Sequence, residues 1–143
     1  IVIDGRGDEA AWQGVRELSP LRDIEGAAIP HRCRTRMVWD DSYLYILADM
    51  DEEHLWATLT ERDSVIYHDP DFEVFIDPDG DGLNYIELEI NALNTVWDLF
   101  LARPYRFNDS NILHDWDIRG LKHAVNLRGT LNNPADTDEG WSV

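Results

Sequence analysis

The stretch DFEVFIDPDGDGLNYIELEIN, Asp71 to Asn91, alternates polar and apolar residues on either side of a DPDGDG turn. Neighbouring residues of a strand point to opposite faces, so this alternation predicts an antiparallel hairpin. The aliphatic residues of both strands must face the same core, because a slip of one residue in the pairing would bury the acids. We therefore expect one outward sheet face with six polar or aromatic side chains: Glu73, Phe75, Tyr85, Glu87, Glu89 and Asn91.

Other short segments around this hairpin are also strand-like and are separated by clusters of Gly, Pro, Asn and Asp. They cover residues 34–39, 43–50, 95–101 and 123–128, with a further strand starting at Trp141. Helix signals are confined to DEAAWQGV near the N-terminus, enough for one turn or two. The pattern predicts an all-β fold, an antiparallel β-sandwich, in one domain over residues 1–143. Since GWSV begins like a strand with no turn after it, we expect the C-terminal strands of the fold to lie beyond Val143.

The composition limits the partners of this chain. Its 143 residues carry a net charge of −17 at pH 7, which argues against nucleic acids and anionic membrane surfaces. No apolar run approaches the length needed for membrane insertion, and IVIDGRGDEAAW has no signal-peptide pattern. Cys33 is the only cysteine, so no internal disulfide can form. Neutral ligands, cations and basic partners remain open.

The turn of the hairpin contains a candidate metal site. Asp77, Asp79 and Asp81 match the opening of a calcium loop, but the closing Glu of an EF-hand would fall at Leu88. An EF-hand is therefore excluded. Two readings stay open: a solvated turn, in which Asp and Gly supply the backbone conformations, and a looser structural calcium site.

Two carboxylates of the second strand raise the alternative of catalysis. Glu87 and Glu89 are two residues apart, so their backbones are ~7 Å from each other, within the range of glycosidase carboxylate pairs. Neighbours on one strand point the same way, however, and do not flank a bond from opposite sides. The five histidines have no metal-binding spacing, and no phosphate-binding loop is present. A glycoside hydrolase is therefore the weaker reading.

A third reading is saccharide binding, which needs flat rings for stacking and polar groups for the sugar hydroxyls. Trp12, Trp39 and Trp141 have contexts typical of core residues. On this reading Trp97 or Trp116 would stack on the sugar, with Arg103 and Tyr105 as further candidates at the sheet edge. The hydroxyls would be accepted by four side chains: Glu73, Glu87, Glu89 and Asn91. If Val96, Asp98 and Phe100 face outward instead, Trp97 belongs to the core.

Several motifs in order resemble the family 9 carbohydrate-binding modules. IDGRGDEAAW is similar to the opening of that family, and MVWDDSYLYILADMDE to its W-D-D-x-x-L-Y-I strand pair. RDSVIYHDPDFEVFIDPDGDGLNYIELEIN is similar to its E-V-F-I-D segment, and the resemblance continues through WDLFLARPYR, WDIRGLKHAV and GTLNNPADTDEGWSV. Related sandwiches hold haem through Met and His, but Met37 and Met50 have aliphatic neighbours typical of core positions.

The resemblance implies a β-sandwich of the jelly-roll or immunoglobulin-like kind and a non-catalytic saccharide-binding domain outside the cytoplasm: secreted, periplasmic or at the cell surface. It also implies structural calcium and an attached or associated glycoside hydrolase. By the family pattern Tyr67 would stack on the sugar, Glu73 would accept its hydroxyls, and Glu89 replaces a basic residue. A protein-docking module of an extracellular polysaccharide-processing assembly is the alternative with the same fold.

Overall fold

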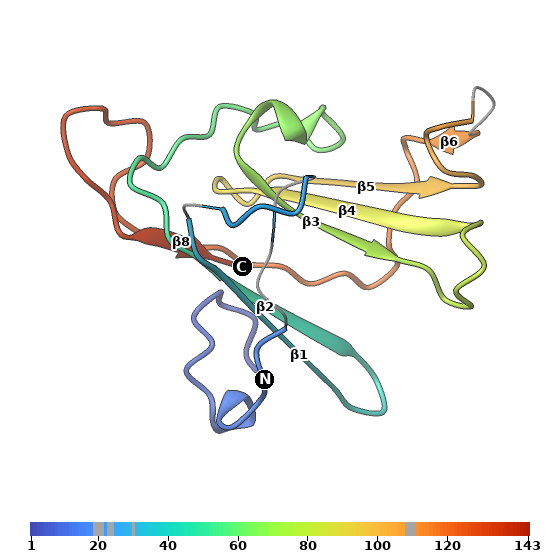
Figure 1. Cartoon of the computed structure of the whole chain (residues 1–143), viewed down its shortest axis with the longest axis horizontal. Helices are drawn as coiled ribbons and strands as arrows, with labels where there is room; N and C mark the ends of the chain where they lie inside the picture. The colour runs from blue at the N-terminus through green and yellow to red at the C-terminus, as the bar shows by residue number, and fades with distance from the viewer. Residues whose placement is uncertain (19–21, 23–24, 30, 108–110) are drawn as a thin grey trace. The chain divides into compact units, whose positions relative to one another are not determined.

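The computed structural model describes residues 1–18, 22, 25–29, 31–107 and 111–143. These residues form two four-stranded antiparallel sheets, in the orders β1-β2-β8-β7 and β3-β4-β5-β6, and no α-helix (Figure 1). The predicted all-β antiparallel β-sandwich is confirmed. Within the same residues, no helix has the length and apolar character needed to cross a bilayer. The chain divides into two compact units, residues 1–56 with 122–143 and residues 57–121, which we describe separately.

The first unit contains the β1-β2-β8-β7 sheet. Its elements are the 3-10 helix η1 (Ala10–Trp12) and the strands β1 (Cys33–Trp39), β2 (Leu44–Met50), β7 (Asn126–Arg128) and β8 (Gly140–Ser142). The strands expected at 34–39, 43–50 and 141 are confirmed, whereas the one expected from residue 123 begins only at Asn126. The helical signal near the N-terminus yields a single 3-10 turn.

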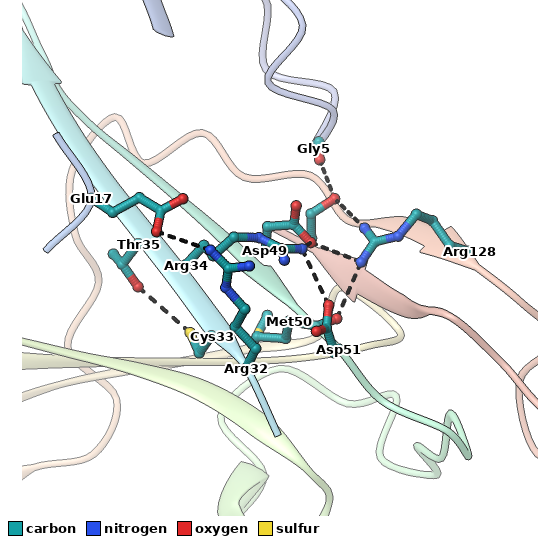
Figure 2. A network of polar contacts seen from close by, with 11 residues as sticks. Gly5, Glu17, Arg32, Cys33, Arg34, Thr35, Asp49, Met50, Asp51 and Arg128 are labelled. Atoms are coloured by element: carbon teal, nitrogen blue, oxygen red, sulfur yellow. Dashed lines mark hydrogen bonds and ion pairs between the residues drawn. The ribbon is translucent and has the colours of Figure 1, made fainter. Parts of the chain in front are cut away.

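Polar contacts link the strands of this first sheet (Figure 2). Arg34 forms ion pairs with Asp49 at 3.0 Å and with Asp51 at 3.2 Å, and Arg128 reaches Asp49 at 2.7 Å. The hydroxyl of Ser142 donates to the carbonyl oxygen of Gly5 at 2.6 Å, which attaches the N-terminal segment to β8. The network therefore connects segments from both ends of the sequence.

One glycine allows β8 to approach β2 closely. Gly140 has a φ of 135°, and a Cβ at this position would lie 1.9 Å from the carbonyl oxygen of Met50. Any side chain here would separate the two strands, so glycine is required by both the backbone angle and the space.

The tryptophans expected in the core do not all lie there. Trp12 and Trp141 are buried, with 4% and 3% of their surfaces exposed. The expectation for Trp39 is wrong, because its side chain is 79% exposed. Trp39 is the last residue of β1 and lies opposite Leu44 at the hairpin turn, where that neighbour is itself half exposed.

The second unit contains the β3-β4-β5-β6 sheet, with β4 between β3 and β5 (Figure 1). Its elements are the 3-10 helix η2 (Ile66–His68) and the strands β3 (Asp71–Ile76), β4 (Tyr85–Asn91), β5 (Val96–Leu101) and β6 (Ile112–Leu113). The predicted hairpin and the strand at 95–101 are confirmed. The short β6 was not predicted, because two residues carry no periodic signal.

A hydrophobic cluster covers one face of this second sheet. Trp97, Leu99 and Leu101 of β5 pack with Ile66 of η2. Four partly buried side chains pack against them: Leu59, Val65, Tyr85 and Ile112. The irregular segment before β3 therefore lies over the same sheet face as the alternate residues of β5. This covering decides the environment of the acidic residues described next.

Candidate functional site

The strand register places the acidic and aromatic residues of the hairpin on one sheet face. Glu73 of β3 lies opposite Glu89 of β4, and Phe75 lies opposite Glu87. Glu89 in turn lies opposite Trp97 of β5. Residues directly opposite in a sheet point to the same side, so the predicted common face is confirmed.

The expectation that this whole face is outward is wrong. Glu87, Glu89 and Asn91 are only 4%, 1% and 0% exposed. η2 and the segment before it lie over Glu89 and Asn91, to which they are hydrogen-bonded. Tyr105, from the loop after β5, contacts Glu87. The sequence alternation identified which residues share the face but not what packs on it.

Some side chains of the face remain accessible. Glu73 is exposed, and Phe75 is 53% exposed. Tyr67, on η2, and Tyr105, on the loop after β5, are 57% and 53% exposed. These four side chains form what we call the aromatic-acidic surface, which combines rings for stacking with a carboxylate that can accept hydrogen bonds.

The two buried glutamates of β4 each contact one of the exposed tyrosines. The backbone N–H of Tyr67 donates to Oε2 of Glu89 at 3.0 Å. The hydroxyl of Tyr105 donates to Oε2 of Glu87 in a short hydrogen bond. Glu87 and Glu89 are alternate residues of β4, so their side chains lie next to each other on one face. Each of the two tyrosines is thus held by one of two neighbouring buried carboxyl groups.

Burial and mutual repulsion raise the pKa values of these acids. Burial raises the pKa of Glu89 to about 8, and the charges of Asp71, Glu73 and Glu87 act in the same direction. Burial also raises the pKa of Asp71 to about 7, with the charge of Glu73 as the next cause. The pKa of Glu87 is raised chiefly by burial, although the hydrogen bond from Tyr105 opposes the shift. At pH 7 the group therefore retains a proton.

Asn91 serves as a structural clamp. Its amide nitrogen donates to the carbonyl oxygen of Leu59 and to Oδ2 of Asp69, both at 2.9 Å. Its amide oxygen accepts the N–H groups of Leu93 and Thr95, at 3.0 and 2.9 Å. Since the amide is fully used and buried, Asn91 fixes the covering segment on the sheet and has no free group for a hydroxyl.

Trp97 is a core residue, contrary to the prediction that it would stack on a ligand. It is 6% exposed and belongs to the hydrophobic cluster with Ile66. Its ring stacks on His114 at 5.5 Å between centroids, and its indole N–H donates to the His114 carbonyl oxygen at 3.3 Å. Trp97 also lies 6.2 Å from the ring of Tyr67, so it forms part of the base under that exposed ring.

The other predicted ligand residues are divided between faces. Tyr85 is partly buried and packs against the cluster, with its ring 6.3 Å from that of Phe75. Trp116 is partly buried against Phe100, which points to the opposite sheet face from Glu87, so it is not part of the aromatic-acidic surface. Arg103 is exposed on the loop that carries Tyr105.

Among the residues that the structure describes, two groups of acids bring carboxylate oxygens within 4.8 Å of one another: Asp77, Asp79 and Asp81 at the hairpin tip, and Asp71, Glu73 and Glu89 on the sheet face. At the tip, Asp77 accepts the N–H groups of Gly80 and Gly82 at 2.9 and 2.8 Å. Asp79 and Asp81 accept further N–H groups of the same turn. The tip carboxylates therefore already have a role in the turn.

The sheet-face group includes an acid that the sequence reasoning missed. Asp71 opens β3 opposite Asn91, and its Oδ2 is buried without a hydrogen-bond partner among the described residues. The available signal was the alternation itself, because residues 71 and 73 point to the same side of a strand. This unsatisfied oxygen distinguishes the sheet-face group from the tip.

Comparison with known proteins gives this fold a family. The sequence profile of the "Carbohydrate family 9 binding domain-like" family matches residues 3–99. Endo-1,4-beta-xylanase A of Thermoanaerobacterium saccharolyticum is 34% identical over 129 residues, which are 88% of this chain and 10% of that protein. Exoglucanase XynX of Acetivibrio thermocellus is 33% identical over 129 residues, which are again 88% of this chain and 10% of that protein.

The chain thus spans about a tenth of the length of these curated relatives. No solved structure matches it significantly. The profile covers well over half of the chain and includes β1 to β4 and most of β5. This chain therefore belongs to the carbohydrate family 9 binding domain-like family, whose members are non-catalytic binding modules.

Proposed function

We propose that this domain binds a saccharide at the aromatic-acidic surface, with Tyr67 and Tyr105 as ring contacts and Glu73 as a hydroxyl acceptor. The observation that carries the proposal is the position of two half-exposed tyrosines beside an exposed carboxylate, in a chain of a carbohydrate-binding family. The C–H face of a sugar ring stacks on an aromatic ring, while its hydroxyls seek polar partners at the edge.

The arrangement of the carboxylates supports binding without hydrolysis. Glu87 and Glu89 lie on the same strand and on the same face of the sheet. Both are buried, so neither flanks a space that a glycosidic bond could enter. Hydrolysis requires two carboxyl groups on opposite sides of that bond.

We propose calcium as the cation of this domain. Asp71, Glu73 and Glu89 on the sheet face fit it better than the three aspartates of the hairpin tip. Calcium takes several oxygen ligands, carboxylates among them. The buried Oδ2 of Asp71 lacks a partner in the described part of the chain, and Glu73 and Glu89 bring oxygens within 4.8 Å of one of its oxygens. A bound cation would replace the proton that now relieves the repulsion between these acids, and it would stabilise the start of β3.

The relatives support a proposal for the setting of the domain. Both are named as polysaccharide-degrading enzymes, and each is about ten times longer than the segment it shares with this chain. We therefore propose that the domain works outside the cytoplasm, secreted, periplasmic or at the cell surface, attached to or beside a glycoside hydrolase. The net charge of −17 agrees with a neutral saccharide as its ligand.

Isothermal titration calorimetry against xylo- and cello-oligosaccharides and their monosaccharides tests the proposal. Wild-type protein should give saturable binding without hydrolysis, and Tyr67→Ala should abolish it. Trp39→Ala is the matched control, because Trp39 is a more exposed ring on the other unit. Equal loss in both variants, or no binding across the panel, would contradict the proposal and favour a protein-docking module.

A further inference from the structure

Two buried carboxyl groups each hold one of the exposed tyrosines. Glu89 accepts the backbone N–H of Tyr67 at 3.0 Å, and Glu87 accepts the hydroxyl of Tyr105. Glu87 and Glu89 are alternate residues of β4, so both lie on the same face of one strand. Tyr67 and Tyr105 come from segments before and after the β3–β5 strands, so the two glutamates attach both segments to the same strand of the sheet.

The burial of the two glutamates separates them from an incoming ligand. They are 4% and 1% exposed, whereas Tyr67 and Tyr105 are more than half exposed. One oxygen of each glutamate already accepts a hydrogen bond from a tyrosine. A ligand that reaches this surface therefore meets the tyrosine rings before the acids beneath them.

We infer that Glu87 and Glu89 are positioning residues that fix the rings of Tyr105 and Tyr67 for saccharide contact, and that neither glutamate touches the ligand. The inference rests on the proposed function and assigns the two acids a different role from that of Glu73, whose carboxylate is exposed. A ring that is fixed before binding loses less conformational freedom when a ligand orders it.

The hydroxyl of Tyr105 has a second consequence. Because it donates to Glu87, it is not available as a donor to a sugar hydroxyl. The phenol oxygen of Tyr105 can therefore only accept a hydrogen bond from a ligand. Removing the hydroxyl should weaken binding chiefly by loosening the ring.

A double-mutant cycle tests the Glu87–Tyr105 half of the inference. Glu87→Gln keeps an oxygen acceptor of the same shape, so its affinity should stay within about twofold of wild type, whereas Glu87→Leu and Tyr105→Phe should each weaken binding by about tenfold. The double variant Glu87→Leu with Tyr105→Phe should bind no more weakly than either single variant, because both changes remove the same contact.

Additive losses in the cycle, or a loss in Glu87→Gln as large as in Glu87→Leu, would mean that the carboxylate contacts the sugar directly and would overturn the inference. Circular dichroism and thermal unfolding of each variant verify the fold. Tyr105→Phe removes only the hydroxyl of a side chain that is more than half exposed, so its affinity can be measured even where Glu87→Leu unfolds.

Amide hydrogen exchange tests the Glu89–Tyr67 half without any ligand. The N–H of Tyr67 should exchange at least about tenfold faster in Glu89→Leu than in Glu89→Gln, because only the amide side chain still offers an acceptor. Equal exchange rates in the two variants would overturn this half. If wild-type protein binds no saccharide while the exchange rates differ as expected, the proposed function fails and the positioning contact stands.

Discussion

Glu73 of β3 and Glu89 of β4 lie directly opposite each other in an antiparallel pair, with carboxylate oxygens within 4.8 Å. Like charges in this relationship destabilise a sheet, and Asp71 adds a third acid to the same group. A feature that opposes folding is typical of a surface kept for binding. From this pair we predict how pH, calcium and single substitutions change the stability of the domain.

The stability of the domain should fall as pH rises through 7 and 8 in the presence of a chelator. Folding raises the pKa of Asp71 from 3.8 to about 7 and that of Glu89 from 4.5 to about 8. Between pH 4 and pH 8 the folded state therefore binds more protons than the unfolded state. Each of the two acids then lowers the unfolding free energy by at most about 1.4 kcal/mol per pH unit as pH rises towards its folded-state pKa. Urea unfolding at pH 5 to 9 measures the slope.

The matched variant for this pH dependence is Glu89→Gln, which removes one titrating group and keeps the acceptor for Tyr67. Its unfolding free energy should vary less between pH 6 and pH 9 than that of wild type. A slope of the same size in both proteins would assign the pH dependence to other groups.

Calcium should raise the melting temperature of the wild-type domain and reduce its loss of stability at pH 8, because the cation relieves the repulsion among Asp71, Glu73 and Glu89 in place of a bound proton. Asp71→Asn should abolish the calcium effect, since Asp71 contributes the buried oxygen without a partner among the described residues. Asp79→Asn at the hairpin tip is the control and should retain the effect. The reverse result would place the ion among Asp77, Asp79 and Asp81.

Trp97→Ala should lower the unfolding free energy by ~3–5 kcal/mol, because it removes a large ring from the cluster with Ile66 and Leu99. Tyr67→Ala should cost about 1 kcal/mol or less, since more than half of that side chain is exposed. Chemical denaturation of both variants measures the difference. Similar losses would mean that Tyr67 belongs to the core and not to the aromatic-acidic surface.

Asp69→Ala should destabilise the second unit by about 3 kcal/mol, because it leaves buried donors without an acceptor. Asp69 accepts the N–H groups of Thr58 and Leu59, both at 2.8 Å, and the amide of Asn91. Burial opposes ionisation of Asp69, but these N–H donors outweigh it and lower its pKa. Its contribution is therefore present above about pH 4 and is lost as pH falls through the lowered pKa.

The control for Asp69 is Asp79→Ala at the exposed hairpin tip, where Asp79 accepts one N–H at 3.3 Å. Its unfolding free energy should change by no more than about 0.5 kcal/mol. Acid titration followed by circular dichroism should also show the Asp69 variant unfolding at a higher pH than the control.

The strands of the second unit were predictable because their residues alternate over five or more positions. That alternation placed the hairpin, the strand at 95–101 and the common side of Glu73, Glu87 and Glu89. It left out β6, whose two residues have no period. The helix signal near the N-terminus predicted one turn or two, and the structure has a single 3-10 turn there. The role of the tip acids as turn residues also follows from their types.

By itself, then, the sequence determined the strands, their pairing and the residues that share each face, because these depend on a period of two along a local segment. Only the tertiary structure decided which part of the acidic face stays accessible. The segment before β3 is irregular and carries no such period, yet Ile66 and Asp69 fix it over Glu89 and Asn91. Burial is set by contacts between segments distant in sequence, so it turned expected ligand contacts into supports for the exposed tyrosines.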